Sequence, residues 1–197
     1  MSTMLVALRV TLVTFVLTGI LYPLAVTGVA RVLFPSAAQG SLVRDEKGRV
    51  VGSSLLGQPF KSPAYFQPRP SAAGDGYDAA NSGGSNLGPT SAKLRERARR
   101  EAARQAEANP GAPMPVPVEL VTTSASGLDP HVSPAAARWQ AERVASVRRL
   151  DPARVRTLVD GLVQGRDLGF LGEPRVNVLL LNIALDQQFG KPGSARP

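Results

Sequence analysis

One short stretch contains the side-chain types from which phosphate-binding loops are built. Residues 77–91 read YDAANSGGSNLGPTS and combine hydroxyls, amides and glycines. Successive backbone N–H groups in such a run can point at one anion, especially near the start of a helix. The candidate anion-binding or nucleotide-binding residues are the five at its centre: Ser82, Gly83, Gly84, Ser85 and Asn86. ATP is the cofactor to consider for them, and no tightly bound cofactor is expected.

The same stretch is also typical of a tight surface turn, and this is the interpretation we favour. Gly83 and Gly84 would supply positive φ angles. The side chains of Asn81, Ser82 and Asn86 would satisfy nearby backbone groups. Contact with a partner subunit is the third role that the stretch allows. The groups expected to brace the turn are a carboxylate and three aromatic rings: Asp78, Tyr65, Phe66 and Tyr77.

The residues that catalysis or metal binding would require are mostly missing from the sequence. There is no cysteine and a single histidine, His131, which excludes thiolate chemistry and leaves little room for a histidine metal site or a catalytic triad. Neither a P-loop motif nor the Asp-Lys-Thr-Gly motif of phosphorylated-aspartate pumps is present. We therefore predict no catalytic residues and no metal ligands, so that the chain is not an enzyme by itself.

The chain is strongly basic, with a formal net charge of +8. Such a charge suits an acidic protein partner, an anionic membrane surface or nucleic acid. Its cations gather in two segments with helical spacing, residues 93–104 and 138–156. No nucleic-acid-binding motif or interleaved aromatic residues accompany them. Nucleic acid is therefore not an expected partner.

An uncharged run, residues 10–30, predicts one membrane-spanning helix. At 1.5 Å per residue it would extend about 31 Å, which matches the hydrocarbon core of a bilayer. A cleaved signal peptide ending at Ala30 is the alternative, and the run is longer than a usual signal core. The count of Lys and Arg favours a cytoplasmic body, but this rule is weak for long domains.

The residues after this run predict one soluble α+β domain with a small sheet and several helices. The predicted domain organisation is a leader (residues 1–9), a transmembrane helix (10–31) and a soluble extracytoplasmic domain (32–197). The predicted elements are, in order, a hairpin over 42–56, a helix over 89–108, a strand over 120–123, helices starting at Pro134 and Pro152, a strand over 175–178 and a helix over 180–188. Between the first two lies a proline-rich segment, residues 60–76, whose aromatics must pack on something.

Four blocks of unusual sequence resemble one known family. They are YFQPRPSA (65–72), the polar stretch 77–91, TTSASGLDPHVSPAAARWQAERVA (122–145) and VNVLLLNIALD (176–186). Together with the N-terminal helix they are similar to the C subunit of the bacterial Kdp potassium-transporting ATPase, KdpC. The resemblance covers nearly the whole chain in the right order.

That resemblance implies an accessory, non-catalytic subunit of a high-affinity potassium-uptake complex. Its expected partners are a P-type ATPase subunit and a potassium-channel-like subunit, in the bacterial inner membrane. It also implies a role in assembly, a catalytic chaperone activity that raises the ATP affinity of the ATPase subunit, and a single-pass anchor with a periplasmic body. The alternative is a nucleotide-binding regulator with a cytoplasmic body, in which Arg69 holds phosphates while Trp139 or Tyr77 stacks on adenine.

Overall fold

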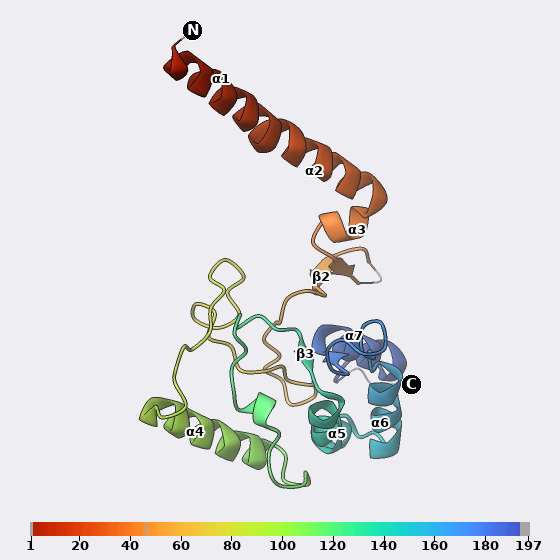
Figure 1. Ribbon diagram of the computed structural model, residues 1–197. Coiled ribbons are helices and arrows are strands. Elements are labelled where there is room, and N and C mark those ends of the chain that lie inside the picture. Colours follow the sequence, from red (N-terminus) through yellow and green to blue (C-terminus); the bar gives the residue numbers. More distant parts are fainter. Residues whose placement is uncertain (1, 46, 194–197) are drawn as a thin grey trace. The chain divides into compact units, whose positions relative to one another are not determined.

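The computed structural model describes residues 2–45 and 47–193, and these divide into two compact units. The first unit is Met1–Ser53 and the second is Ser54–Pro197. Figure 1 shows a long N-terminal helix in the first unit and a body of helices, loops and short strands in the second. The predicted α+β class with an N-terminal apolar helix is confirmed. The predicted domain boundaries at residues 9 and 31 stay a prediction.

The N-terminal helix is continuous but changes its winding near the middle. It comprises α1 (Thr3–Phe15), the π-helical turn η1 (Val16–Leu21) and α2 (Tyr22–Leu33). Pro23 at the start of α2 has no N–H, and its ring would clash with the carbonyl one turn earlier in an ideal α-helix. A wider π-helical turn immediately before the proline accommodates the ring.

Two threonines in this helix bond back to the preceding turn. The Thr14 hydroxyl donates to the Val10 carbonyl oxygen at 2.8 Å, and the Thr18 hydroxyl donates to the Thr14 carbonyl oxygen at 2.7 Å. A polar hydroxyl that is paired in this way can lie in an apolar medium without an unmet hydrogen bond.

The first unit ends in a short helix and a hairpin. The helix α3 spans Pro35–Ala38, and the strands β1 (Leu42–Arg44) and β2 (Val50–Ser53) pair antiparallel with Leu42 opposite Ser53. Asp45 and Arg49 close the turn through an ion pair of 2.7 Å. The predicted hairpin is confirmed, with shorter strands than its sequence pattern indicated.

The second unit contains four helices of more than two turns among its described residues. Its elements are α4 (Ala92–Ala108), the 3₁₀ turn η2 (Val118–Leu120), β3 (His131–Val132), α5 (Pro134–Arg148), α6 (Pro152–Gly161), β4 (Val176–Asn177) and α7 (Val178–Phe189). Polar side chains cap the last three helices: Ser133 accepts from Ala136 N–H, Asp151 from Ala153 N–H and Asn177 from Leu180 N–H. The predicted αα-hairpin of α5 and α6 and the final strand and helix are confirmed.

Three sequence predictions about this unit need correction. The strand expected over 120–123 is wrong: the chain forms η2 instead, because Glu119 turns back to accept from both the N–H and the hydroxyl of Ser133. The strands form two separate two-stranded sheets, β1–β2 and β3–β4, and not one. The helix expected from residue 89 begins later, because the Ser91 hydroxyl caps it by accepting from Leu94 N–H.

The core lies among α5, α6, α7 and the loops of the body. Its largest fully buried apolar side chains are Phe66, Leu120, Leu181, Leu185 and Val144. One face of the helix α4 is half-buried or buried at spacings of three and four residues, through Leu94, Glu101 and Gln105, while its basic side faces outward.

Five consecutive residues of the proline-rich segment, 63–67, are held by side chains of α5 and α7; we call them the clamped segment. The buried Asn182 amide bonds both backbone groups of Phe66, accepting from its N–H and donating to its carbonyl, each at 2.9 Å. The buried Gln140 amide does the same for Gln67, at 2.8 and 3.0 Å. Two helix side chains thus replace the neighbouring strand that would normally pair with such a backbone.

Two arginines of α5 bind the preceding carbonyls of the clamped segment. Arg143 donates through one guanidinium nitrogen to the carbonyl oxygens of Pro63 and Tyr65. Arg148 donates to the Ala64 carbonyl oxygen at 2.7 Å and lies over the Tyr65 ring, 4.7 Å from its centroid. Every carbonyl oxygen of the clamped segment therefore accepts a hydrogen bond from a side chain on α5 or α7.

Candidate functional site

The polar loop, residues 77–91, packs on the segment that precedes β3. The Gly83 N–H donates to the Ser126 carbonyl oxygen at 2.9 Å, and the Ser82 hydroxyl donates to the same oxygen at 3.0 Å. Gly84 approaches so closely that a Cβ atom on it would lie 2.8 Å from the Ala125 carbonyl oxygen. The centre of the loop is therefore part of the packed body.

The five predicted site residues have different surroundings. Ser82 and Asn86 are exposed, whereas Gly83, Gly84 and Ser85 are half-buried. One N–H of the proposed anion cradle, that of Gly83, is already bonded to Ser126. An anion-binding or nucleotide-binding role for these residues stays a prediction.

The expected backbone role of the two glycines is wrong. Neither Gly83 nor Gly84 has a positive φ angle; the left-handed residues of the loop are Tyr77, at φ 58°, and Asn86, at φ 48°. Asparagine tolerates this region better than most residues do. Gly84 is instead the residue that the close approach to Ala125 requires.

Substituting these two glycines tests whether close packing requires a glycine at position 84. We expect Gly84→Ala to lower the free energy of unfolding by about 1–3 kcal/mol, because its methyl group would overlap the Ala125 carbonyl oxygen. Gly83→Ala is the matched control, since a Cβ atom there meets nothing within 4 Å, and we expect a change of at most about 0.5 kcal/mol. Urea unfolding of the full chain in detergent measures both values. Equal losses would contradict the packing explanation.

Tyr77 braces the polar loop, as predicted. Its hydroxyl donates to the Arg69 carbonyl oxygen at 2.7 Å, and its N–H donates to the Ser71 hydroxyl at 2.8 Å. Burial, with a smaller contribution from the charge of Glu101, raises the pKa of Tyr77 to about 12. Asp78 closes a local turn by accepting from the Asn81 side chain and the Ala80 N–H.

The other two aromatic residues expected at the polar loop belong elsewhere. Phe66 is fully buried in the core within the clamped segment. The Tyr65 hydroxyl donates to Asp186 on α7 at 2.9 Å. Trp139, considered as an adenine-stacking residue, is buried and donates from its indole nitrogen to the Pro113 carbonyl oxygen at 2.6 Å.

A charged cluster lies beside the polar loop. Arg69 donates to Asp129 at 3.3 Å and to the Thr123 carbonyl oxygen at 3.2 Å. The other carboxylate oxygen of Asp129 accepts from the His131 N–H at 2.9 Å. Burial opposes ionisation of Asp129, but the hydrogen bonds from His131 and the charge of Arg69 outweigh it and lower the pKa. The arginine proposed to hold phosphates is thus bonded within the body.

The lowered pKa of Asp129 predicts a loss of stability in acid. A carboxyl whose folded pKa lies below its unfolded value of about 3.8 stabilises the fold above that value, and this contribution disappears as the pH falls through the folded pKa. We expect Asp129→Asn to lower the free energy of unfolding at pH 7 by about 1 kcal/mol. The difference from the parent chain should shrink below pH 4 in thermal melts. Asp160→Asn, at an exposed ion pair with Arg138, is the control; a difference that persists at pH 2.5 would contradict the mechanism.

The helix Thr3–Leu33 is the second candidate functional surface. The helix has 31 residues, and its most apolar 18-residue window has a mean hydropathy of 2.2 and no buried side chain. At 1.5 Å per residue it extends about 46 Å, which exceeds the hydrocarbon thickness of a bilayer. Among the described residues this helix alone is long and apolar enough to cross a membrane.

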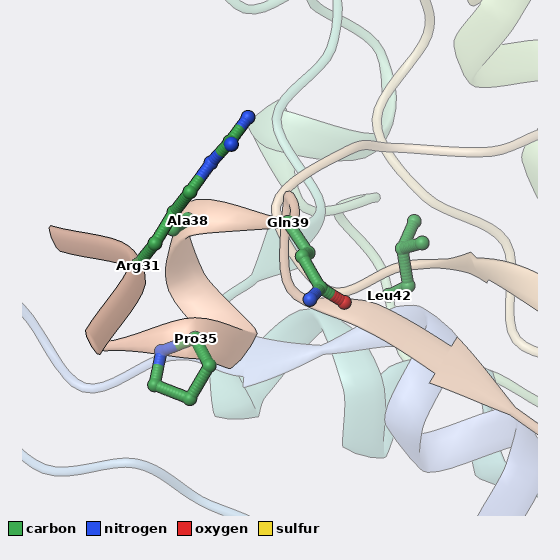
Figure 2. A pocket seen from close by; sticks show the side chains of 5 residues that line it. All are labelled: Arg31, Pro35, Ala38, Gln39 and Leu42. Atoms are coloured by element: carbon green, nitrogen blue, oxygen red, sulfur yellow. The ribbon is translucent and has the colours of Figure 1, made fainter. Parts of the chain in front are cut away.

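A shallow hollow of about 600 Å³ lies at the end of this helix. It is lined by Arg31, Pro35, Ala38, Gln39 and Leu42. Figure 2 shows the Arg31 side chain extending away from the Pro35 ring. With one cation, one amide and three apolar side chains, the hollow has no group that could act as a general base. Within residues 2–45 and 47–193, no three His, Asp or Glu side chains gather as metal ligands would.

Comparison with known proteins identifies close relatives. The family model described as "KdpC: K+-transporting ATPase, c chain" matches residues 4–187. A protein of Myxococcus xanthus named potassium-transporting ATPase KdpC subunit is 64% identical over 196 residues, covering 100% of this chain and 93% of the relative. Proteins of the same name from Rhodospirillum rubrum and Koribacter versatilis are 56% and 52% identical, covering 94% and 93% of this chain and 98% and 93% of the relatives.

Proposed function

Because the chain belongs to the KdpC family, the c chains of K⁺-transporting ATPases, we propose that it assembles and stabilises an ATP-driven potassium-uptake complex. It acts there without ATPase chemistry of its own, beside a P-type ATPase subunit and a potassium-channel-like subunit. The observation that carries this proposal is the exposed apolar helix Thr3–Leu33 in a chain that matches the family from residue 4 to residue 187.

The apolar helix is the anchor in this proposal. In lipid, helices associate through close packing of small residues and through hydrogen bonds, not through the hydrophobic effect. Gly19 and Gly28 lie on this helix; a Cβ atom added to Gly28 would meet nothing within 4 Å, and one added to Gly19 would meet the Phe15 ring of the same helix at 3.5 Å. They leave room for another membrane helix to come near the backbone.

We propose that this subunit raises the ATP affinity of the ATPase subunit through assembly and not through a shared nucleotide site. A chain that binds the ATP-competent state of the ATPase more tightly than the other states necessarily raises ATP affinity, because the two binding events are linked. Its own polar loop does not need to touch the nucleotide. This fits the polar loop, where the Gly83 N–H is already bonded within the body.

The experiment compares the detergent-solubilised complex with and without this chain. We expect a lower KM for ATP and a more stable complex when the chain is present, and no ATP hydrolysis by the chain alone. In parallel, a fluorescent ATP analogue is titrated against the isolated full chain, with Gly83→Ala as a second sample. An unchanged KM would overturn the chaperone role. Saturable ATP binding that is lost in Gly83→Ala would favour the nucleotide-binding alternative.

We also propose that the chain is a single-pass protein of the cell inner membrane whose body faces the extracytoplasmic side. The absence of cysteine allows a clean test, because each single-cysteine variant carries one thiol. Thr90→Cys lies at an exposed position of the body, and Ser2→Cys lies before the helix. In spheroplasts, a membrane-impermeant maleimide should label Thr90→Cys at once and Ser2→Cys only after lysis. The reverse pattern would place the body in the cytoplasm.

A further inference from the structure

The segment between α6 and β4 forms a small hairpin with an apolar tip; we call residues 164–175 the apolar hairpin. Gln164 and Arg175 exchange two backbone hydrogen bonds, at 2.8 and 3.0 Å, and Asp167 and Leu171 exchange two more at 2.9 Å. The backbone of the turn is therefore satisfied internally and keeps a defined shape.

The tip presents three large apolar side chains to solvent. Leu168 is 83% exposed and Phe170 is 69% exposed, with Leu171 beside them. Exposed apolar residues are normal when they are scattered singly, but a group of three on one ordered turn marks an interaction site. Nothing in the described part of the chain covers them.

Leu168 also lies in an unfavourable backbone conformation. It has a φ of 54°, followed by Gly169 at 83°. The left-handed region that Leu168 occupies favours Gly, Asn or Asp, so a leucine there is strained. Glycine would adopt this conformation without strain, and the exposed leucine side chain adds no packing to the fold. The leucine therefore points to a role in binding.

Two ion pairs hold the base of the tip and determine the charge around it. Arg166 pairs with Glu173 at 2.8 Å, and Arg175 pairs with Asp167 at 3.2 Å. The carboxylate side chains are 78% and 65% exposed, whereas their arginine partners are only 45% and 32% exposed. The apolar tip therefore has a rim whose outermost charged groups are hydrogen-bond acceptors.

We infer that the apolar hairpin docks into an apolar hollow, rimmed by hydrogen-bond donors, on another chain of the potassium-transporting ATPase complex. This inference rests on the proposed assembly function. The exposed carboxylates favour a protein over a bilayer as the occupant, because phosphate headgroups would repel Asp167 and Glu173 while arginine, lysine or backbone N–H groups would bind them. The aromatic ring of Phe170 is the expected anchor, since aromatic side chains dominate such contacts.

The first test uses the full chain co-expressed with the other chains of the complex. Phe170→Ser and Leu168→Gly should each weaken retention of the chain on the tagged complex by about tenfold in dissociation constant. Val118→Ser is the matched control, because Val118 is 71% exposed at the start of η2 in the same body. If the parent chain itself is not retained, the assembly function fails. If the parent and both hairpin variants are retained equally, only the docking inference fails.

Stability measurements separate docking from folding. Leu168→Gly removes a strained side chain that the body does not cover, so its melting temperature should equal or exceed that of the parent. A melting temperature well below that of the parent would assign Leu168 to the fold and overturn the inference. The same holds if Phe170→Ser unfolds the body.

A probe at the tip distinguishes the occupants. Leu168→Cys carries the chain's one thiol and can be labelled with a polarity-sensitive dye. In nanodiscs that contain the chain alone, the dye should report water and should resist quenching by nitroxide lipids. It should become protected when the partner chains are present. Quenching by nitroxide lipids would show a membrane contact, and protection that grows with concentration of the chain alone would show self-association; either outcome overturns the inference.

Discussion

Arg143→Met is expected to lower the free energy of unfolding by about 3–5 kcal/mol, one of the two largest effects that the structure predicts. The Arg143 side chain is buried, and it binds oxygen atoms of Pro63, Tyr65, Asn109 and Gln140. Methionine fills a similar volume but donates no hydrogen bond. Several buried acceptors would lose their partner together, and each unmet group destabilises the fold by about 1–3 kcal/mol.

Burial of the Arg143 charge destabilises the fold and offsets part of the stability that its hydrogen bonds contribute. No carboxylate among the described residues pairs with Arg143, and burial, together with the charge of Arg104, lowers the pKa of its guanidinium to about 10. The group therefore remains charged at pH 7 in spite of an unfavourable environment. Removing a buried charge returns part of the lost stability. We expect the loss of the four acceptors' partner to outweigh this effect, because two of these acceptors are backbone carbonyls of the clamped segment, those of Pro63 and Tyr65.

Denaturant unfolding of the full chain in detergent, followed by tryptophan fluorescence, measures this effect. Trp139 lies on the same helix and is buried, so its emission reports the core. Arg138→Met is the control, since Arg138 pairs with Asp160 at the surface, where an ion pair contributes about 0–1 kcal/mol. A loss below 1 kcal/mol for Arg143→Met would mean that water satisfies the freed acceptors.

Asn182→Ala is expected to lower the free energy of unfolding by about 2–4 kcal/mol. Its amide bonds both the N–H and the carbonyl of Phe66, and both residues are buried. Alanine would leave a fully buried peptide group without either partner. Gln187→Ala, at an exposed position of the same helix, should change the free energy by at most about 0.5 kcal/mol.

A double substitution tests whether the two amides act as one unit. Gln140→Ala should destabilise the fold by a similar amount to Asn182→Ala, because Gln140 bonds both backbone groups of the next residue, Gln67. Once one peptide group is freed, the neighbouring one loses its fixed position. The double variant should therefore lose less than the sum of the single losses. Strict additivity would show that Phe66 and Gln67 are held independently.

Local sequence signals predicted the helices well. A helix start was predicted at Ser133 with Pro134 and at Asp151 with Pro152, and α5 and α6 begin there. These signals act within four residues, so one sequence contains all the information that they need. The apolar run that became α1, η1 and α2 was recognisable by composition for the same reason.

The supporting contacts of the body were not predictable in this way. Phe66 bonds a side chain 116 residues later, and Gln67 bonds one 73 residues later. Gln140 lies within the predicted helix that starts at Pro134, but nothing local indicated what its amide binds. Composition alone suggested an irregular proline-rich segment. Only the fold reveals which helices supply hydrogen-bond partners for its backbone.

The polar loop likewise has features that the sequence predicts and features that only the fold reveals. Its composition indicated a turn with glycines, and the structure contains a packed loop. The reason for Gly84 is the carbonyl oxygen of Ala125, which the sequence does not reveal. For the apolar hairpin, a signal was present: Leu168 and Gly169 stand between short runs that pair, and the turn residue Gly169 could have indicated a hairpin.

The clamped segment also has a consequence for how the protein is made. Its peptide groups at Phe66 find their partner only after residue 182 has been synthesised. A chain that stops before α7 leaves that peptide group without its partners, and incomplete chains with uncovered backbone and apolar surface are prone to aggregate. Completion of the last helix is therefore a condition for folding a segment that lies 116 residues earlier in the chain.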